Sequence, residues 1–424
     1  MIPKSDETTI MLATYRAFCL LFLGLLPAAL AWGSGSLLPR VPADALGMAD
    51  ANVALGDGAT AQITNPAAIV DQGETGTWVF GTVVGRVETN YLRYVDAGAA
   101  LAGAYSPEIS YPVLPFFAWS SRLSDNLAWG LSFETVFGLG SDWPDHSFDQ
   151  TLGSTVDIAR ESELTTLRFG PTLAWRATSR LGLGARVFAQ AADAREESDL
   201  ATVEGKGLSG GFQVGARYTA EAWAAGLAYT SRTDTKLRGD FDTFAPLTPA
   251  SGDATAHILL PDRLQAGVAL RVLPDVWWEV DLDWLGWSYV SELTIVRDDG
   301  AILNAGRNAR GNDDTLSVRT GIEWRYRPGL TWRAGLGYDP TPVPDRDVSP
   351  TAGMVRKTRI ALGADIHTAD GLKLGLAYQF IYGHERQVRE SSQDDLSGVG
   401  DTSAFEGKYS SRSHAVGITL SGAL

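Results

Sequence analysis

Residues 372–382 read Leu-Lys-Leu-Gly-Leu-Ala-Tyr-Gln-Phe-Ile-Tyr, and this stretch decides the fold class. The even positions are all large and apolar or aromatic, whereas Lys373, Gly375, Ala377 and Gln379 occupy the first four odd ones. A strand with lipid on one side and a lined interior on the other must alternate in this way. The pattern recurs from about residue 75 to the C-terminus, most clearly at 263–272, 278–284 and 316–327. The sequence therefore predicts an all-β, transmembrane antiparallel β-barrel.

The alternating stretches number about fourteen. They lie near 76–88, 110–122, 126–138, 160–177, 180–192, 206–219, 222–232, 262–273, 276–290, 314–327, 330–339, 356–367, 371–384 and 406–424. Tight turns such as Pro274-Asp275 and Pro328-Gly329 alternate with long segments at 139–159, 233–261, 291–313, 340–355 and 385–405. Short periplasmic turns and long external loops are typical of a bacterial barrel with an even number of strands. Closure into a barrel leaves no unpaired strand edge in the membrane.

The first residues predict export. Residues 15–31 contain Arg16, an apolar run from Phe18 to Leu26, and the small-x-small sequence Ala29-Leu30-Ala31. This is typical of a signal peptide, because the apolar core is too short to span a membrane. We expect residues 1–31 to be removed and Trp32 to begin the mature chain, with Met1 or Met11 as the true start. Cys19, the one cysteine, falls inside this peptide, so no disulfide is expected.

Composition narrows the function classes. A mean hydropathy near zero would suit a soluble protein, but half of each barrel strand faces the lumen, so a barrel averages out similarly. The net charge of −15 argues against a nucleic-acid partner. Clusters of Asp and Glu between the alternating stretches are interpreted as solvated loops, with divalent-ion bridging to lipopolysaccharide as the alternative.

The alternation also assigns faces. Val268 and Leu374 are predicted to face lipid and to reject charge, whereas Gly267 and Lys373 are predicted to face inward and to accept polar changes more easily. Tryptophans near strand ends are predicted to form an interfacial girdle. These are Trp129, Trp175, Trp223, Trp278, Trp284, Trp324 and Trp332.

The segment before the first strand does not alternate. Residues 37–69 are rich in Gly, Ala, Asn and Asp and include Asn65-Pro66-Ala67. Small residues with short helical turns suit a segment packed inside a barrel, where backbone polar groups need partners in little space. We therefore expect three regions, namely a signal peptide at 1–31, a hatch (plug) at 32–75 and the barrel at 76–424.

These motifs resemble the FadL/TodX family of outer-membrane transporters. The likeness rests on Asn65-Pro66-Ala67 before the first strand and on three further stretches in order along the chain. They are Trp129-Gly130 to Phe137-Gly138-Leu139, 281–288 (Asp-Leu-Asp-Trp-Leu-Gly-Trp-Ser), and 338–345 (Tyr-Asp-Pro-Thr-Pro-Val-Pro-Asp) with Arg359 beyond it. The resemblance implies a fourteen-stranded barrel plugged by its N-terminal segment and kinked in the third strand.

The same resemblance implies passive, ligand-gated uptake of hydrophobic compounds, either long-chain fatty acids or hydrocarbons, with lateral release through the barrel wall. It places the lateral exit near Phe133, Phe137, Gly138 and Gly140, and substrate capture in loops 139–159 and 233–261. The expected setting is the bacterial outer membrane, with its lipid, lipopolysaccharide and barrel-assembly machinery as partners. The expected protein is a monomer without cofactor or metal.

Charged residues on the inward parity have two interpretations. Most are expected to be ion-paired groups that hold the hatch. An arginine left unpaired could instead bind a fatty carboxylate with two parallel hydrogen bonds. The candidates are Arg168, Arg319, Arg359 and Lys373.

Two other functions remain open at this stage. A general diffusion porin would share the barrel but would need a water-filled path. An outer-membrane lipid-modifying enzyme would need a catalytic constellation, and none of the five histidines has a partner at a known motif spacing. His414 beside Ser413 is the nearest approach to one.

Overall fold

The computed structural model describes residues 38–72, 76–94, 101–151, 155–245, 249–290, 295–298, 300, 311–350, 355–368, 370–389, 391 and 405–423. The predicted signal peptide lies outside these residues. Within them, no helix is long and apolar enough to cross a membrane.

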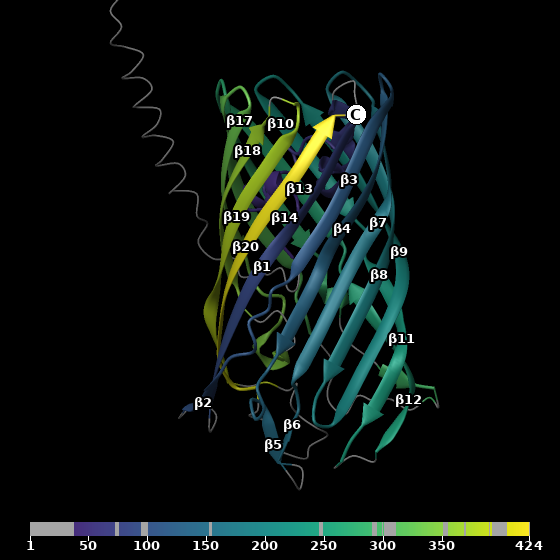
Figure 1. The fold of residues 1–424 in the computed structure, drawn as a ribbon, viewed down its shortest axis with the longest axis vertical. Coiled ribbons are helices and arrows are strands. Elements are labelled where there is room, and N and C mark those ends of the chain that lie inside the picture. The colour runs from purple at the N-terminus through teal and green to yellow at the C-terminus, as the bar shows by residue number, and fades with distance from the viewer. Residues whose placement is uncertain are drawn as a thin grey trace, which may run out of the picture. The chain divides into compact units, whose positions relative to one another are not determined.

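The fold is a closed antiparallel barrel of fourteen strands, as predicted (Figure 1). The first seven positions are taken by β1 (Thr77–Tyr94), β3 (Val113–Ser124), β4 (Leu127–Asp142), β7 (Glu161–Arg176), β8 (Leu181–Glu197), β9 (Ala201–Thr219) and the pair β10 (Trp223–Thr230) and β11 (Thr233–Thr243). The remaining seven are the pair β12 (Ala250–Leu260) and β13 (Arg263–Leu273), then β14 (Val276–Leu285), β16 (Thr315–Arg327), β17 (Leu330–Asp339), β18 (Lys357–His367), β19 (Lys373–Val388) and β20 (Gly407–Ala423).

The ring closes between its first and last strands. β1 pairs with β20 from Thr77 opposite Ala423 to Arg93 opposite Gly407. Four shorter strands lie at the end of the barrel with the long loops. They are β2 (Leu101–Tyr105), β5 (Asp149–Thr151), β6 (Thr155–Asp157) and β15 (Ile295–Arg297). The 3-10 turns η2 (Trp287–Tyr289) and η3 (Asp345–Asp347) lie at the same end.

The segment 233–261 differs from the prediction of a long loop. β11 and β12 continue the barrel wall there and pair with each other from Thr233 opposite Leu260 to Thr243 opposite Ala250. In β11 every second residue except Gly239 is buried, but the exposed positions include Asp234, Lys236 and Arg238 instead of apolar residues. In Figure 1 the hairpin extends past the neighbouring barrel strands at the long-loop end, so we infer that its outer face meets water and therefore lacks the lipid-facing pattern. Because few residues on the outer face of these two strands are apolar, sequence alternation did not identify them as strands.

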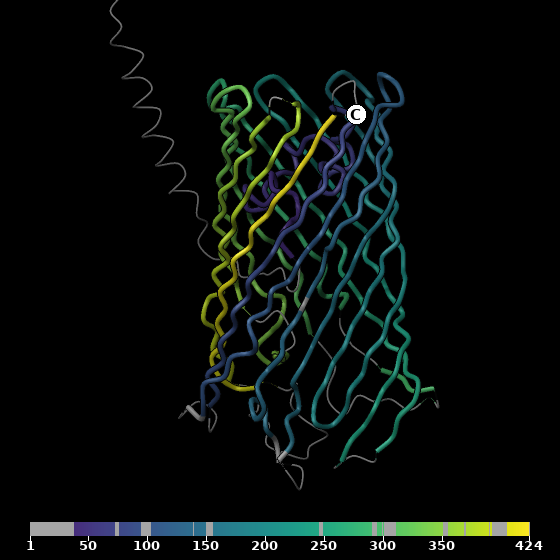
Figure 2. Tube along the Cα trace, viewed as in Figure 1, coloured from purple at the N-terminus to yellow at the C-terminus, as the bar shows by residue number. Residues whose placement is uncertain are grey.

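The N-terminal segment 38–72 lies inside the barrel, and we call it the hatch. It contains the short helices α2 (Ala43–Leu46) and α3 (Ala61–Thr64) and the 3-10 turn η1 (Pro66–Asp71). Figure 2 shows this purple segment enclosed by the strands, nearer the barrel end at which the chain terminates. Most of its residues are buried, although many are small or polar. The barrel is therefore plugged.

The predicted faces agree with the exposed fractions of the side chains. Val268 is 51% exposed and its neighbour Ala269 is fully buried. Four of the girdle tryptophans are also exposed on the outer wall. These are Trp175, Trp223, Trp324 and Trp332. The outward parity therefore forms an apolar band with aromatic edges.

The expectation that Gly267 accepts polar changes is wrong. A Cβ atom at Gly267 would lie 2.2 Å from Oδ1 of Asp281 and 3.0 Å from the hatch residue Val53. The hatch and the residues that contact it fill the space on the inward face. An inward position can therefore reject a larger side chain even though it does not face lipid.

We predict that Val268→Arg destabilises the barrel by about 2–4 kcal/mol, because a charge would face hydrocarbon near the middle of the strand. The matched control is Val268→Ile, which keeps an apolar side chain and should unfold like the unmodified protein. Denaturant unfolding in lipid vesicles measures both. Equal stability of the two variants would refute the assigned outward face.

Candidate functional site

The hatch is fastened to the wall by carboxylates of β14. Two oxygens of Glu279 accept hydrogen bonds from the backbone N–H groups of Ala54 (2.6 Å) and Leu55 (3.1 Å), and Asp281 accepts one from Val53 (3.1 Å). Both acids are almost fully buried. Three successive hatch amides are thus satisfied by side-chain carboxyl oxygens of the wall.

The motif Asn65-Pro66-Ala67 lies where the hatch meets β8 and β9. The Asn65 amide donates to the carbonyl of Ala216 (3.0 Å) and its oxygen accepts from the N–H of Ala67 (3.2 Å). A Cβ at Gly184 would lie 2.4 Å from the Ala67 nitrogen. Glycine is needed at that wall position because the hatch backbone approaches it so closely.

Three of the four candidate basic residues have carboxylate partners. Arg319 pairs with Asp283 and Asp339, and Arg359 pairs with Asp339 and with the hatch residue Asp50. Lys373 lies 3.3 Å from Asp365. Because a buried charge is expensive without a partner, these groups stabilise the hatch and wall, and they are already engaged.

Arg168 on β7 is the exception. Its Nε donates to Gln190 (2.9 Å), and its guanidinium carbon lies 4.4 Å from the centre of the Phe188 ring. The nearby Glu134 pairs with Arg186 instead. Among the described residues, no carboxylate lies within 4.0 Å of Arg168, although its side chain is buried. Of the four candidates, Arg168 is therefore the one whose guanidinium group could still pair with a bound carboxylate.

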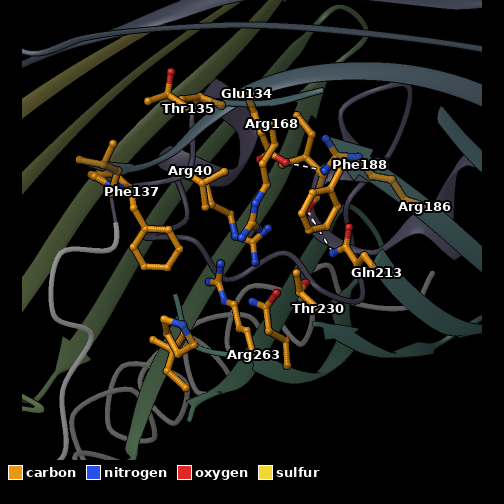
Figure 3. A pocket seen from close by; sticks show the side chains of 18 residues that line it. Arg40, Glu134, Thr135, Phe137, Arg168, Arg186, Phe188, Gln213, Thr230 and Arg263 are labelled. Atoms are coloured by element: carbon orange, nitrogen blue, oxygen red, sulfur yellow. Dashed lines mark hydrogen bonds and ion pairs between the residues drawn. The ribbon is translucent and has the colours of Figure 1, made fainter. Parts of the chain in front are cut away.

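Arg168 lines a small cavity of about 40 Å³ with three further arginines, Arg40, Arg186 and Arg263 (Figure 3). Arg263 is held by Asp283 through two hydrogen bonds of 2.7 and 2.6 Å. Nε and Nη2 of both Arg40 and Arg186 are buried and have no hydrogen-bond partner within the described part of the chain. Four guanidinium groups against one lining carboxylate, Glu134, make this an anion-binding environment.

Arg40 comes from the hatch, not from a strand. Its Nη1 bonds to the hydroxyl of Thr64, and its backbone N–H donates to Asp50. Burial lowers the pKa of Arg40 to about 10, and the neighbouring Arg263 acts in the same direction. Arg40 nevertheless remains charged at neutral pH. Arg40 was not among the residues predicted from the sequence, although an arginine in a segment of small residues was a usable signal.

β4 carries a bulge between Thr135 and Gly138. Its pairing with β7 runs in step to Thr135 opposite Leu167 and resumes at Gly138 opposite Thr165. Val136 and Phe137 therefore face the single residue Thr166. Such a bulge bends the strand and locally interrupts pairing.

A window opens in the wall beside this bulge. The pairing of β3 with β4 ends at Phe117 opposite Phe133, although β4 continues to Asp142. Beyond the window, the N–H of Glu108 donates to the carbonyl of Asp142 (2.8 Å) and rejoins the two segments. On the far side of the window, Gly85 and Val87 of β1 bond to Pro112 and Ser110. The gap is thus bounded on all sides.

A second cavity of about 490 Å³ lies behind the window. It extends from Leu114 and Gly140 at the gap to Val83 and Ile381 inside the barrel, and Trp143 lines its outer part. Gly138 and Gly140 both line it, and a Cβ at Gly140 would meet nothing closer than the Ser110 hydroxyl at 3.7 Å. Of the exit candidates, Phe133 marks the last paired position, whereas Phe137 is buried and contacts Trp287.

Leu38 separates the two cavities. Both cavities touch Leu38, Pro39 and Thr135. The N–H of Leu38 donates to the carbonyl of Val136 (3.2 Å), and its side chain lies 3.1 Å from the Cβ position of Gly138. The start of the described hatch is therefore attached to the bulge itself. Nothing in the sequence pattern indicated this contact.

The fold and site define a class, that of plugged transmembrane barrels with a window in the wall. The family model described as "Outer membrane protein transport protein (OMPP1/FadL/TodX)" matches residues 24–423. The chain belongs to this family of outer-membrane transport proteins, as its motifs suggested.

Two relatives with names share a low sequence identity with this chain. The long-chain fatty acid transport protein of Salmonella typhi is 24% identical over 364 residues, which cover 75% of this chain and 80% of that protein. The protein of the same name from Escherichia coli (strain K12) is 24% identical over 370 residues, covering 75% and 81%.

Two solved structures share the fold. A Pseudomonas aeruginosa FadL homologue has a TM-score of 0.77 at 17% identity and covers 92% of this chain and 99% of its own. The P. putida toluene transporter TodX has a TM-score of 0.71 at 14% identity, covering 93% and 99%.

Because the hatch is held by many bonds, we predict that the intact protein gives little steady ion conductance in a planar lipid bilayer. Removal of residues 38–72 should create an open pore, since no strand is lost. Large and constant conductance from the intact protein would favour the general porin.

Proposed function

We propose that this protein takes up hydrophobic compounds by passive diffusion and releases them sideways into the membrane between β3 and β4. The observation that carries the proposal is the bounded window, with the larger cavity directly behind it. The residues proposed for the exit are Phe133, Phe137, Gly138 and Gly140.

Solvation favours this route. Apolar surface exposed to water costs about 25 cal/mol per Å², so an apolar solute gains nothing from a water-filled pore. A cavity that opens at the level of the wall lets the solute pass from protein to lipid without crossing the periplasm. The plugged lumen also argues against a general porin.

Transport, not catalysis, is proposed as the role of the site. His414, which is adjacent to Ser413, bonds through Nδ1 to the hydroxyl of Tyr378 at 2.8 Å. Both Ser413 and His414 line the larger cavity, and this contact occupies Nδ1 of the histidine. The family description likewise names transport.

The relatives leave two substrate classes, since their names refer to long-chain fatty acids and to toluene. The arginine-lined cavity supports the former. Arg168, with Arg40 and Arg186 beside it, would bind the carboxylate of a fatty acid. The small volume suits a headgroup alone, and the tail would extend past Leu38 into the larger cavity.

The proposed organisation is a signal peptide at 1–31, a hatch at 32–75 that includes Asn65, Pro66 and Ala67, and a monomeric barrel at 76–424. Because the family is located in the outer membrane, we also propose that the protein contacts lipopolysaccharide and the barrel-assembly machinery.

The exit is tested by blocking the window reversibly. Gly140→Cys has room for a side chain, and the predicted mature chain has no other cysteine. Attaching a bulky group through a disulfide should abolish oleate uptake by whole cells, and reduction should restore it. The control is Val187→Cys, labelled in the same way on the lipid-facing side of β8. Undiminished uptake by fully labelled Gly140→Cys protein would rule out this exit.

The carboxylate site is tested with two substrates. Arg168→Met keeps the length of the side chain but removes its charge. A hydrogen bond to a charged group contributes about 1.5–3 kcal/mol, so oleate binding should weaken at least about tenfold. Toluene uptake should not change, and Arg168→Lys should lose less oleate affinity. Equal losses for oleate and toluene would contradict a headgroup role.

A further inference from the structure

The bulge in β4 is closed by a side chain instead of the backbone. Thr166 on β7 is the single residue opposite Val136 and Phe137. Its hydroxyl accepts a hydrogen bond from the N–H of Phe137 (3.0 Å) and donates one to the carbonyl of Phe137 (3.2 Å). Thr166 is fully buried.

A side-chain hydroxyl can make both bonds. A backbone N–H or C=O inside a membrane protein must have a partner, because no water is available in the wall to replace it. Ser and Thr offer a donor and an acceptor on one atom, whereas Val has the same shape as Thr and offers neither. Thr166 therefore removes the free-energy cost of leaving the N–H and C=O of Phe137 unpaired. Without Thr166, that cost would favour the return of β4 to regular pairing.

The bulge fixes three neighbouring groups. The carbonyl of Val136 accepts the hatch N–H of Leu38. The ring of Phe137 points into the lumen and meets Trp287 edge-on, with ring centres 6.1 Å apart and planes at 87°. Gly138 comes to line the cavity behind the window. Each of these placements depends on the backbone of Val136 and Phe137 leaving the regular ladder.

We propose that Thr166 is the positioning residue that holds the lateral window open, by satisfying both backbone groups of Phe137 and so keeping β4 bent away from β3. This inference rests on the proposed lateral exit. Thr166 does not contact the substrate in this mechanism. It acts through β4.

The test compares Thr166→Val with Thr166→Ser and with Thr172→Val. Thr172 is a matched control, because it is buried on the same strand and its hydroxyl has no hydrogen-bond partner among the residues described. Oleate uptake by whole cells should fall about tenfold in Thr166→Val, as expected when two buried polar groups lose their partner. Thr166→Ser should restore uptake to near the unmodified level, and Thr172→Val should leave it unchanged.

A second measurement reports the window directly. In a Gly140→Cys background, the rate of thiol labelling from the lipid phase should fall in Thr166→Val and recover in Thr166→Ser. A merely stabilising role would not slow labelling at Gly140. If Thr166→Val and Thr172→Val behave alike in uptake and labelling, or if Thr166→Ser fails to rescue, the proposal is overturned.

One outcome separates this proposal from the lateral exit itself. Loss of uptake in blocked Gly140→Cys protein, with normal uptake in Thr166→Val, would overturn the role of Thr166 and leave the exit intact. If Thr166→Val does not fold, hydrogen exchange in the unmodified protein decides. Slow exchange of the Phe137 amide is expected, and exchange as fast as that of an unpaired amide would overturn the proposal.

Discussion

The requirement that every backbone polar group in a membrane find a partner within the protein governs this structure. It forces the strands into a closed ring, and it makes any gap in that ring expensive. The window between β3 and β4 is such a gap, and its edges are rebuilt from other sources. Ser110 and Pro112 extend the pairing of β1, Glu108 rejoins Asp142, and Thr166 and Leu38 engage the bulge. The opening is therefore a satisfied structure, not a defect.

The same requirement explains why so many charged and polar wall residues contact the hatch. A segment of short helices exposes amides and carbonyls that regular structure leaves unpaired. Glu279 and Asp281 take up three such amides, and Arg217 and Gln213 donate to hatch carbonyls. Arg319 and Arg359 then share Asp339 and reach the hatch through Asp50. Because breaking a buried pair costs more than the pair gains, this network favours one fixed position for the plug.

Alternation predicted the wall because lipid imposes one rule on every outward residue. The prediction failed where the rule stops, as in β11 and β12, whose outer face carries Lys236 and Arg238 above the apolar band. Inward positions follow local packing instead, so Gly267 could not be judged from parity, nor could paired Arg359 be told from unpaired Arg168. Motif resemblance implied only a kink in the third strand, with an exit near Phe133, Phe137, Gly138 and Gly140. The contacts that hold the bulge, from Thr166 and Leu38, join distant segments through single hydrogen bonds and leave no periodic trace in the sequence.

Leu38 links the two halves of the site. The arginine-lined cavity offers about 40 Å³, enough for a headgroup, and the larger cavity behind the window offers about 490 Å³. A molecule held by its head at Arg168 can leave through the window only if its head also passes Leu38. That step separates an anion from several guanidinium groups, which is unfavourable unless the carboxylate is neutralised or another partner replaces them. A neutral hydrocarbon meets no such barrier. The same window would therefore release an apolar molecule readily and an acid slowly, so that the arginines set the residence time and the bulge sets the route.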